Sequence, residues 1–340
     1  RSTHCISSAA SDVYKRQGQL FFVFFLAVFG GLSGPGIYSA QYFGQGNKEG
    51  YQKIFRLKVW ITALLTVVGV IVFLVGGEWL IGLYLKGSGG NLDAGLTLES
   101  ALSYLHIMLI GLVPFAITQI YAGSLREMGE SMKPMLAGLV SVVVDIVFNY
   151  FLIYGKFGFP RLEVKGAAIA TVMARFAEMF VVIIWTHVEI EKYSFLKNVY
   201  RTLRISLQEM MPVIIKGLPI FFNEFLWAGG MAVLTQCYSM KGLEVIAGLN
   251  ISNAICNLLN VVFIAMGNAV GIIMGQFLGA SKFEEAKKNA NKLMWFTAML
   301  CVGLTVILII LSGVFPRAYN TTDEIRNLGR WFIIITAAFF

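Results

Sequence analysis

The chain has 340 residues, of which 57% are hydrophobic and only 14% charged, and its mean hydropathy is +0.72. Because soluble domains carry about 25% charged residues, this composition excludes an ordinary soluble enzyme, a disordered protein and a nucleic-acid-binding module. The net charge of +8 fits basic loops that face the cytoplasm and its anionic lipid. We therefore expect a polytopic membrane protein that binds the lipid bilayer and no nucleic acid.

The two ends of the chain differ from what lies between them. Residues 1–17 are polar, lack the apolar core of a signal peptide and look like a translated vector or sequencing tail, so we exclude them from the fold. The last ten residues, WFIIITAAFF, are apolar but make up only about half a membrane span. These features predict a fragment that is cut at both ends.

Eight apolar stretches are long enough to cross a bilayer as helices, because a span needs about 20 apolar residues. They are too long for barrel strands and show no strict alternation, so we expect an all-α polytopic membrane protein. In chain order the stretches are 18–46, 59–77, 101–125, 134–155, 166–186, 217–240, 245–281 and 293–316.

The distribution of Lys and Arg predicts which loops are cytoplasmic. The first, third, fifth and seventh loops hold about twice as many basic residues as the loops between them, so we place them inside. The longest of these, 188–212, has apolar residues at helical spacing with Lys197, Arg201 and Arg204 between them. It predicts an amphipathic inter-lobe linker that rests as a helix on the inner leaflet; an ordinary solvated linker is the alternative.

An internal repeat relates residues 31–60 to residues 265–295. A gapless shift aligns seven identical pairs, namely Gly36/Gly271, Ile37/Ile272, Gln41/Gln276, Gly44/Gly279, Glu49/Glu284, Lys53/Lys288 and Trp60/Trp295. Six spans separate the copies, so both cross the membrane in the same direction. A parallel repeat of this kind is typical of two-lobed transporters, in which substrate binds between the lobes. We expect two six-helix lobes, truncated here to an N-terminal lobe over 18–187 and a C-terminal lobe over 213–340.

Several polar side chains fall inside the spans, where charge is costly and indicates a cavity or a partner. Glu224 lies mid-span after Pro219, whose missing N–H loosens the helix. Its carboxylate is a candidate to bind Na⁺, hold a proton or attract a cationic compound; a structural hydrogen bond is the alternative. Asp145 and Asn149 share one helix face and form a second candidate site, with a structural polar pair as the alternative.

Two further patterns concern one helix each. Arg175 and Glu178 are three residues apart, which predicts a structural ion pair. Asn253 and Asn257 belong to a stripe of four amides on one helix face, completed by Asn250 and Asn260. This stripe either lines a central cavity or packs between helices through hydrogen bonds.

Four segments of the chain resemble a known family. The segments that carry the resemblance are SLREMGESMKP (124–134), VVVDIVFNYFLIYGKFGFPRLEVKGAAIATVMAR (142–175), GLPIFFNEFLWAGG (217–230) and GNAVGIIMGQFLGASKFEEAKK (267–288). They are similar to the multidrug and toxic compound extrusion (MATE) transporters, over about residues 18–340. The resemblance implies a twelve-helix antiporter of the bacterial inner membrane, entered here at its second helix and left in its tenth. It also implies export of cationic amphiphilic compounds in exchange for Na⁺ or H⁺, and places Thr171 near the first-lobe site.

The remaining expectations concern function class. The sequence has no GK[ST] phosphate loop and no HExxH, so we expect neither an enzyme nor a primary pump, and no cofactor or metal beyond the coupling ion. The partners expected are a small cationic substrate and the bilayer, with the protein acting as a monomer. A flippase for lipid-linked oligosaccharides is the alternative within the same superfamily, and a channel or structural protein is a third. The mid-span charges favour the exporter, because Asp145, Glu178 and Glu224 outnumber Arg175, whereas a flippase needs basic groups for its pyrophosphate.

Overall fold

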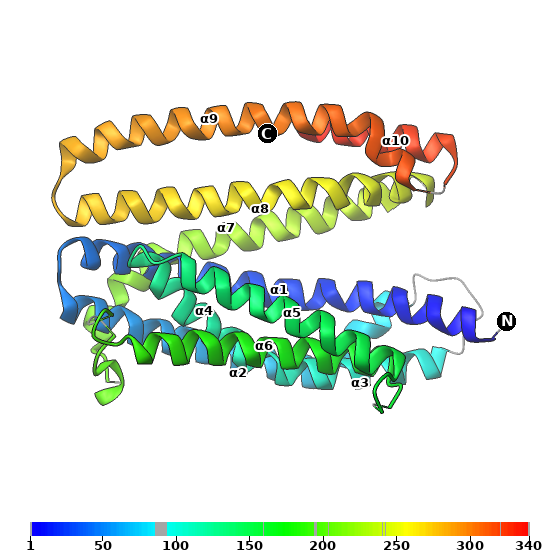
Figure 1. The fold of residues 1–340 in the computed structure, drawn as a ribbon, viewed down its shortest axis with the longest axis horizontal. Helices are drawn as coiled ribbons and strands as arrows, with labels where there is room; N and C mark the ends of the chain where they lie inside the picture. The colour runs from blue at the N-terminus through cyan, green and yellow to red at the C-terminus, as the bar shows by residue number, and fades with distance from the viewer. Residues whose placement is uncertain are drawn as a thin grey trace. The chain divides into compact units, whose positions relative to one another are not determined.

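The computed structural model describes residues 2–85, 94–158, 160–193, 196–202, 204–239, 241, 243–319 and 321–338, and in these residues all regular elements are helical. This confirms the all-α prediction. The elements, coloured in chain order in Figure 1, are α1 (Ser2–Gly44), α2 (Lys48–Leu85), α3 (Ala94–Ile110), α4 (Leu112–Glu127), α5 (Met132–Tyr154), α6 (Glu163–Val188), η1 (Val199–Arg201), α7 (Leu207–Ser239), α8 (Leu243–Gly279), α9 (Phe283–Val314), η2 (Phe315–Ala318) and α10 (Asp323–Ala337).

Eight helical stretches of the described chain are long and apolar enough to cross a membrane, which confirms the predicted spans and a multi-pass membrane protein. The third span differs from the expectation in one respect, because it consists of two helices that meet at Gly111. There the Gly111 N–H bonds the carbonyl of Met108 at 2.9 Å, in the tighter three-residue pattern, and Pro114 has no N–H to continue the ladder. The sequence Gly-Leu-Val-Pro therefore breaks the span near its middle.

The first helix extends further toward the start of the chain than expected. The backbone of α1 is helical from Ser2, so most of the polar tail at 1–17 continues the helix of the first span. The side chains of residues 1–20 lie outside the described residues. That the tail is non-native and packs against nothing stays a prediction.

The chain divides into two compact units, Arg1–Phe225 and Leu226–Phe340. The division falls within α7, whereas the sequence places the start of the second lobe at 213. The first turns of α7 stay with the first unit because Val213 is buried against Ile54 and Leu57 of α2. An ion pair of 2.8 Å between Lys53 and Glu209 holds the same two helices together.

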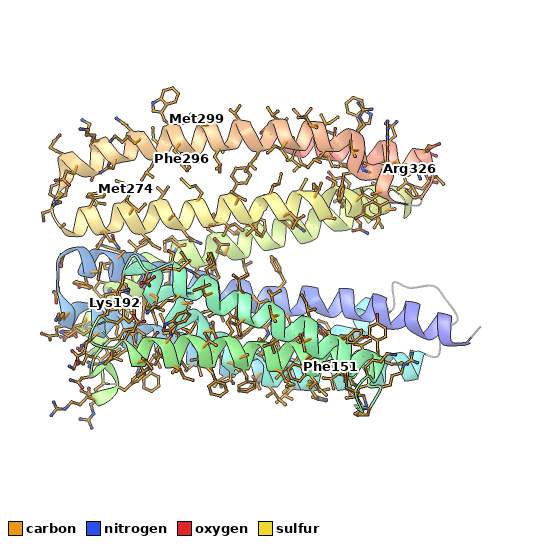
Figure 2. All side chains as sticks on the ribbon, viewed as in Figure 1. Phe151, Lys192, Met274, Phe296, Met299 and Arg326 are labelled. Atoms are coloured by element: carbon orange, nitrogen blue, oxygen red, sulfur yellow. The ribbon has the colours of Figure 1, made fainter. Side chains whose placement is uncertain are left out.

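The segment between α6 and α7 is not the amphipathic helix that its spacing predicts. It consists of turns and the short η1, and Asn198 adopts a left-handed φ of 62° that a continuous helix does not allow. Its apolar side chains Tyr193, Leu196 and Val199 are buried in the first unit rather than turned toward lipid. Their helical spacing therefore reflects packing on protein. Lys192, labelled in Figure 2, belongs to this linker and bonds Glu130 in the turn between α4 and α5.

In the second unit α8, α9 and α10 pack on one another around a small core. Ile255 and Cys256 of α8, Leu308 of α9, and Ile333 and Ala337 of α10 form it. Most other apolar side chains of α9 are exposed, among them Phe296 and Met299 in Figure 2, as expected of a surface that faces lipid.

The two copies of the repeat have the same local backbone. The first copy ends α1 at Gly44 and begins α2 at Lys48; the second ends α8 at Gly279 and begins α9 at Phe283, at equivalent positions. The turn residues Gly46 and Ser281 are also equivalent, and both are left-handed, with φ of 69° and 58°. The repeat found in the sequence is therefore a repeat of local structure.

Candidate ion- and substrate-binding residues

Asp145 and Asn149 lie one turn apart on α5 and bond to each other. The Asn149 amide donates to Asp145 Oδ2 at 3.0 Å. The other oxygen of each side chain, Asp145 Oδ1 and Asn149 Oδ1, is buried and has no hydrogen-bond partner in the described part of the chain. Two unsatisfied acceptor oxygens on one helix face suit a cation or a proton donor, since buried acceptors are otherwise nearly always paired.

The packing of α5 on α6 sets the level of Thr171 relative to this pair. Ser141 donates to the carbonyl of Ala174 at 3.1 Å, and the two helices run in opposite directions. One turn further along α5 is Asp145, and three residues back along α6 is Thr171. The register therefore brings Asp145 and Thr171 to the same level, with Thr171 half-buried.

Arg175 contributes a cation to the same region of α6, but it forms no direct ion pair within the described residues. Its guanidinium lies over the rings of Phe25 and Phe115, 4.7 and 4.9 Å from their centroids. The predicted ion pair with Glu178 is therefore not a direct contact in the described residues, although Glu178 and Asp145 both attract the guanidinium through space. Arg175 therefore contacts two aromatic rings, whereas the sequence predicts that it contacts Glu178.

Glu224 lies inside α7, which continues as a helix through Pro212 and Pro219. Its side chain packs on α1 at Gly30, where a Cβ would come within 3.3 Å of the Glu224 Cγ. The carboxylate is half-buried and forms no ion pair with the described residues. Glycine at position 30 therefore makes room for a membrane carboxylate that no basic side chain of the described residues pairs with.

Asn253 and Asn257 belong to the second unit and are exposed there. The buried face of α8 is formed by Ile251, Ser252 and Ile255, so the amide stripe faces away from α9 and α10. The structure thus groups Asp145, Asn149 and Thr171 on α5 and α6, places Glu224 on α7 against α1, and leaves the stripe on a separate unit.

Lys58 and Glu127 form a buried ion pair that sequence reasoning missed. The Lys58 ammonium donates to Glu127 Oε2, and the two residues are only 1% and 6% exposed. In the sequence both residues stand at the ends of spans and resemble ordinary loop charges. The available signal was the position of Lys58 beside an uninterrupted apolar run, one residue before Val59.

A scan for protein families matches the MatE family model over residues 13–151 and 219–340. The chain belongs to the MatE family. Among curated relatives it is 24% identical over 318 residues to the probable multidrug resistance protein YoeA of Bacillus subtilis, covering 93% of this chain and 67% of that protein. It is 25% identical over 241 residues to the probable multidrug resistance protein NorM of Bacillus cereus, covering 70% and 53%. The chain thus spans between about half and two thirds of these relatives.

Solved structures share the fold of this MatE chain. A MATE crystal structure in the bent conformation superposes with a TM-score of 0.80 at 20% identity, covering 97% of this chain and 71% of that one. A mutant of the Vibrio cholerae MATE transporter VcmN also gives 0.80, at 16% identity, covering 97% and 74%. This chain therefore has the two-lobe helical fold of the family.

Proposed function

We propose that the protein is a secondary antiporter that exports cationic amphiphilic compounds in exchange for Na⁺ or H⁺. It works as a monomer in the bacterial cytoplasmic membrane, and Glu224 and the Asp145–Asn149 pair are its cation sites. The relatives' names, multidrug resistance proteins, support an exporter of this kind.

One observation carries the proposal. The described spans contain carboxylates, Asp145 and Glu224 above all, that make no direct ion pair. A charge in hydrocarbon is retained only where it has a function or a partner. A carboxylate that no basic side chain of the described residues contacts attracts a cation from outside the protein, and both the coupling ion and the substrate meet that requirement.

A shared carboxylate also explains how exchange is coupled. One negative charge cannot satisfy two cations at once, so binding of the ion lowers the affinity for the substrate, and the reverse holds equally. One charge moving through the membrane potential supplies about 2.3 kcal/mol per 100 mV. That corresponds to a concentration ratio of roughly fiftyfold for each ion, since 1.4 kcal/mol is tenfold. Ion entry therefore suffices to drive export against a substantial gradient.

The test is Glu224→Gln in the full-length protein, reconstituted into vesicles with Na⁺ and pH gradients imposed separately. Gln is nearly isosteric, so packing on Gly30 is kept, but it neither releases a proton nor balances a cation. We expect dye export to fall at least tenfold while the amount of folded protein stays the same. The matched control is Glu284→Gln, an exposed carboxylate at the start of α9, which should export normally.

Export by Glu224→Gln at the normal rate, with unchanged dependence on the ion gradient, would show that this carboxylate is only structural. The same vesicles separate the exporter from the flippase alternative. Translocation of an anionic lipid-linked oligosaccharide, without efflux of a cationic dye, would favour the flippase. Arg175 would then be the candidate residue for binding the substrate's phosphate, since a guanidinium is the kind of group that binds phosphate.

A further inference from the structure

The strongest feature that the proposed function does not use is the ion pair of Lys58 and Glu127. It joins α2 to α4, and both side chains are almost completely enclosed. Lys58 also reaches the Ser124 hydroxyl at 3.4 Å, and the carbonyl of Ser124 accepts a hydrogen bond from the buried Tyr51 at 2.8 Å. The Ser39 side chain of α1 lies beside the same carboxylate. Three helices therefore meet at one buried pair of charges.

From this pair a row of close contacts leads along α1 to Glu224. A Cβ at Gly36 would lie 2.9 Å from Glu127 Oε1, so the carboxylate rests directly on α1. One half-turn back, a Cβ at Gly34 would lie 2.6 Å from the Gly217 Cα of α7. One turn further is Gly30, which holds the side chain of Glu224. The position of α1, set at one end by the ion pair, thus fixes the surroundings of Glu224 at the other.

Packing alone does not require charges at this place. Removing two charges from water offsets most of their mutual attraction, so apolar side chains of similar size usually hold a protein interior equally well or better. In the second copy the residue equivalent to Lys58 is Leu293, so the same hairpin forms there, in a more exposed setting, without a charge at this position. A buried pair of charges that packing does not require is better explained by what it does when the structure changes.

The surroundings of the pair favour its hydration. Thr62 lies one turn beyond Lys58 on α2, and Thr118 lies on the buried face of α4. Both hydroxyls are buried and have no hydrogen-bond partner among the residues that the structure describes. A buried polar group without a partner destabilises the dry state, whereas water would satisfy it. The interior between α2 and α4 therefore gains polar interactions if water enters it.

We propose that Lys58 and Glu127 are positioning residues for transport. They form a latch at the junction of α1, α2 and α4, and this junction is dry while α1 stays packed against α7. When α1 moves away from α7, the pair and the two threonines become hydrated. Because a hydrated pair is about as stable as a buried one, the two states differ little in free energy, as alternating access requires. An apolar pair would favour the dry state only. The role as a latch for Glu224 rests on the proposed function.

The test replaces the whole pair, since a single substitution would leave an unpaired buried charge. Lys58→Met/Glu127→Leu should remain folded, with an unfolding midpoint at or above that of the unmodified protein. We expect its maximal export rate to fall at least tenfold while its KM for a cationic dye changes less than threefold. A matched control is Lys53→Met/Glu209→Leu, which removes a partly exposed ion pair between α2 and α7 and should export normally.

Hydration of the latch is measured directly with Ser39→Cys, in a background whose native cysteines are replaced by serine. The thiol lies beside Glu127 and reacts with a water-soluble maleimide only when water reaches the junction. We expect labelling in the presence of dye and ion gradient, and at least tenfold slower labelling when the apolar pair is present. This readout does not depend on Glu224, so it separates failure of the latch from failure of the proposed coupling site.

Three results would overturn the latch. Normal export by the apolar pair would make the charges merely structural. Equal labelling of Ser39→Cys with and without the charges would show that they do not control hydration. Loss of folding in the double variant would show that the pair is needed for the fold itself, contrary to the argument from Leu293.

Discussion

The two copies of the repeat share a backbone but not an environment. In the first copy the N–H groups of Gly46 and Asn47 close the end of α1 on Phe43 and Tyr42 at 3.0 and 2.9 Å. In the second copy the equivalent bonds, from Ser281 to Leu278 and from Lys282 to Phe277, are both 3.1 Å. These bonds are the 5→2 and 6→1 pattern that ends a helix with one left-handed residue. The turn is thus fixed by local sequence, and one copy even manages it without glycine.

The difference lies in what each turn's helices touch. Gly34 and Gly36 of α1 make close contacts, with the α7 backbone and with Glu127 respectively, whereas a Cβ at Gly271 meets no described atom within 4 Å. The linker also bonds to α2, through Gln52 to Lys197 and Arg56 to Val199, both at 2.9 Å. The same helical hairpin therefore serves as a packed, charge-latched junction in one unit and as a far more exposed one in the other. Matched substitutions in the two copies test this contrast.

The largest effect is expected from Gly34→Ala. The added Cβ would lie 2.6 Å from the Gly217 Cα, and backbone cannot turn aside as a side chain can. We expect a loss of about 2–3 kcal/mol, typical of overpacking, together with reduced export. The equivalent residue in the second copy is already Ala269, and Ala269→Gly should cost only about 1 kcal/mol through helix propensity. Equal losses from the two variants, measured by unfolding in detergent, would contradict the close crossing of α1 and α7.

Gly36→Ala should have an intermediate effect. Its Cβ would come 2.9 Å from Glu127 Oε1, and a carboxylate held by Lys58 can shift only by straining the ion pair. We expect a loss of about 1–2 kcal/mol. Gly271→Ala is the matched variant in the second copy and should be neutral or stabilise by up to about 1 kcal/mol, because alanine favours helix. The comparison needs only the two unfolding midpoints, and the proposed contact fails if Gly36→Ala is as harmless as Gly271→Ala.

Asn47→Ala should have a smaller effect at the start of α2. The Asn47 side chain accepts the Gly50 N–H at 2.9 Å and so caps the helix, whereas the equivalent Lys282 makes no such bond. Loss of a cap costs about 1 kcal/mol, so Asn47→Ala should lower the unfolding midpoint and Lys282→Ala should not. An equal response in the two copies would mean that the cap contributes nothing measurable.

The sequence correctly predicts the features of the fold that depend on local residue patterns. Apolar run length predicts the eight spans, and the identities around Gly44 and Gly279 predict two equivalent hairpins. Glu224 falls within a continuous membrane-length helix, five residues after Pro219, as its position in the apolar run predicts. The wrong prediction, an amphipathic helix after α6, has a physical cause. Leu196 and Val199 belong to the helically spaced set, but the same spacing also occurs in a turn-rich segment that buries these residues on protein.

Contacts between distant residues could not be predicted in this way. Lys58 and Glu127 are 69 positions apart, and either alone looks like a loop charge. Arg175 meets two phenylalanines from other helices, although its nearest acidic neighbour in sequence is Glu178. In both cases the side chain's partner is chosen by helix packing, which depends on residues spread over the whole unit. Functional roles for the candidate site residues stay predictions, namely Glu224, Asp145, Asn149, Thr171, Asn253 and Asn257.

The smallest effect concerns the linker that covers the first copy, and it depends on pH. Lys192 donates to Glu130 at 2.8 Å, and Tyr193 donates to the same oxygen at 3.1 Å. The hydrogen bond from the Lys192 ammonium holds the pKa of Glu130 below its ordinary value. A carboxyl whose pKa is lower in the folded state stabilises that state above its unfolded pKa of about 4.3. This contribution disappears as the pH falls through the lower, folded value.

Glu130→Gln should therefore destabilise the protein at pH 7 by no more than about 1 kcal/mol, because Lys192 is largely exposed and the pair is screened by water. The difference from the unmodified protein should shrink as the pH is lowered below about 4, where the carboxyl becomes protonated. Glu191→Gln is the control, since its pair with Lys197 lies in the open on the same linker and should contribute little at any pH. A deficit of Glu130→Gln that persists unchanged at low pH would mean that the Glu130 side chain acts through packing, and that its ion pair with Lys192 does not help to hold the linker on the first unit.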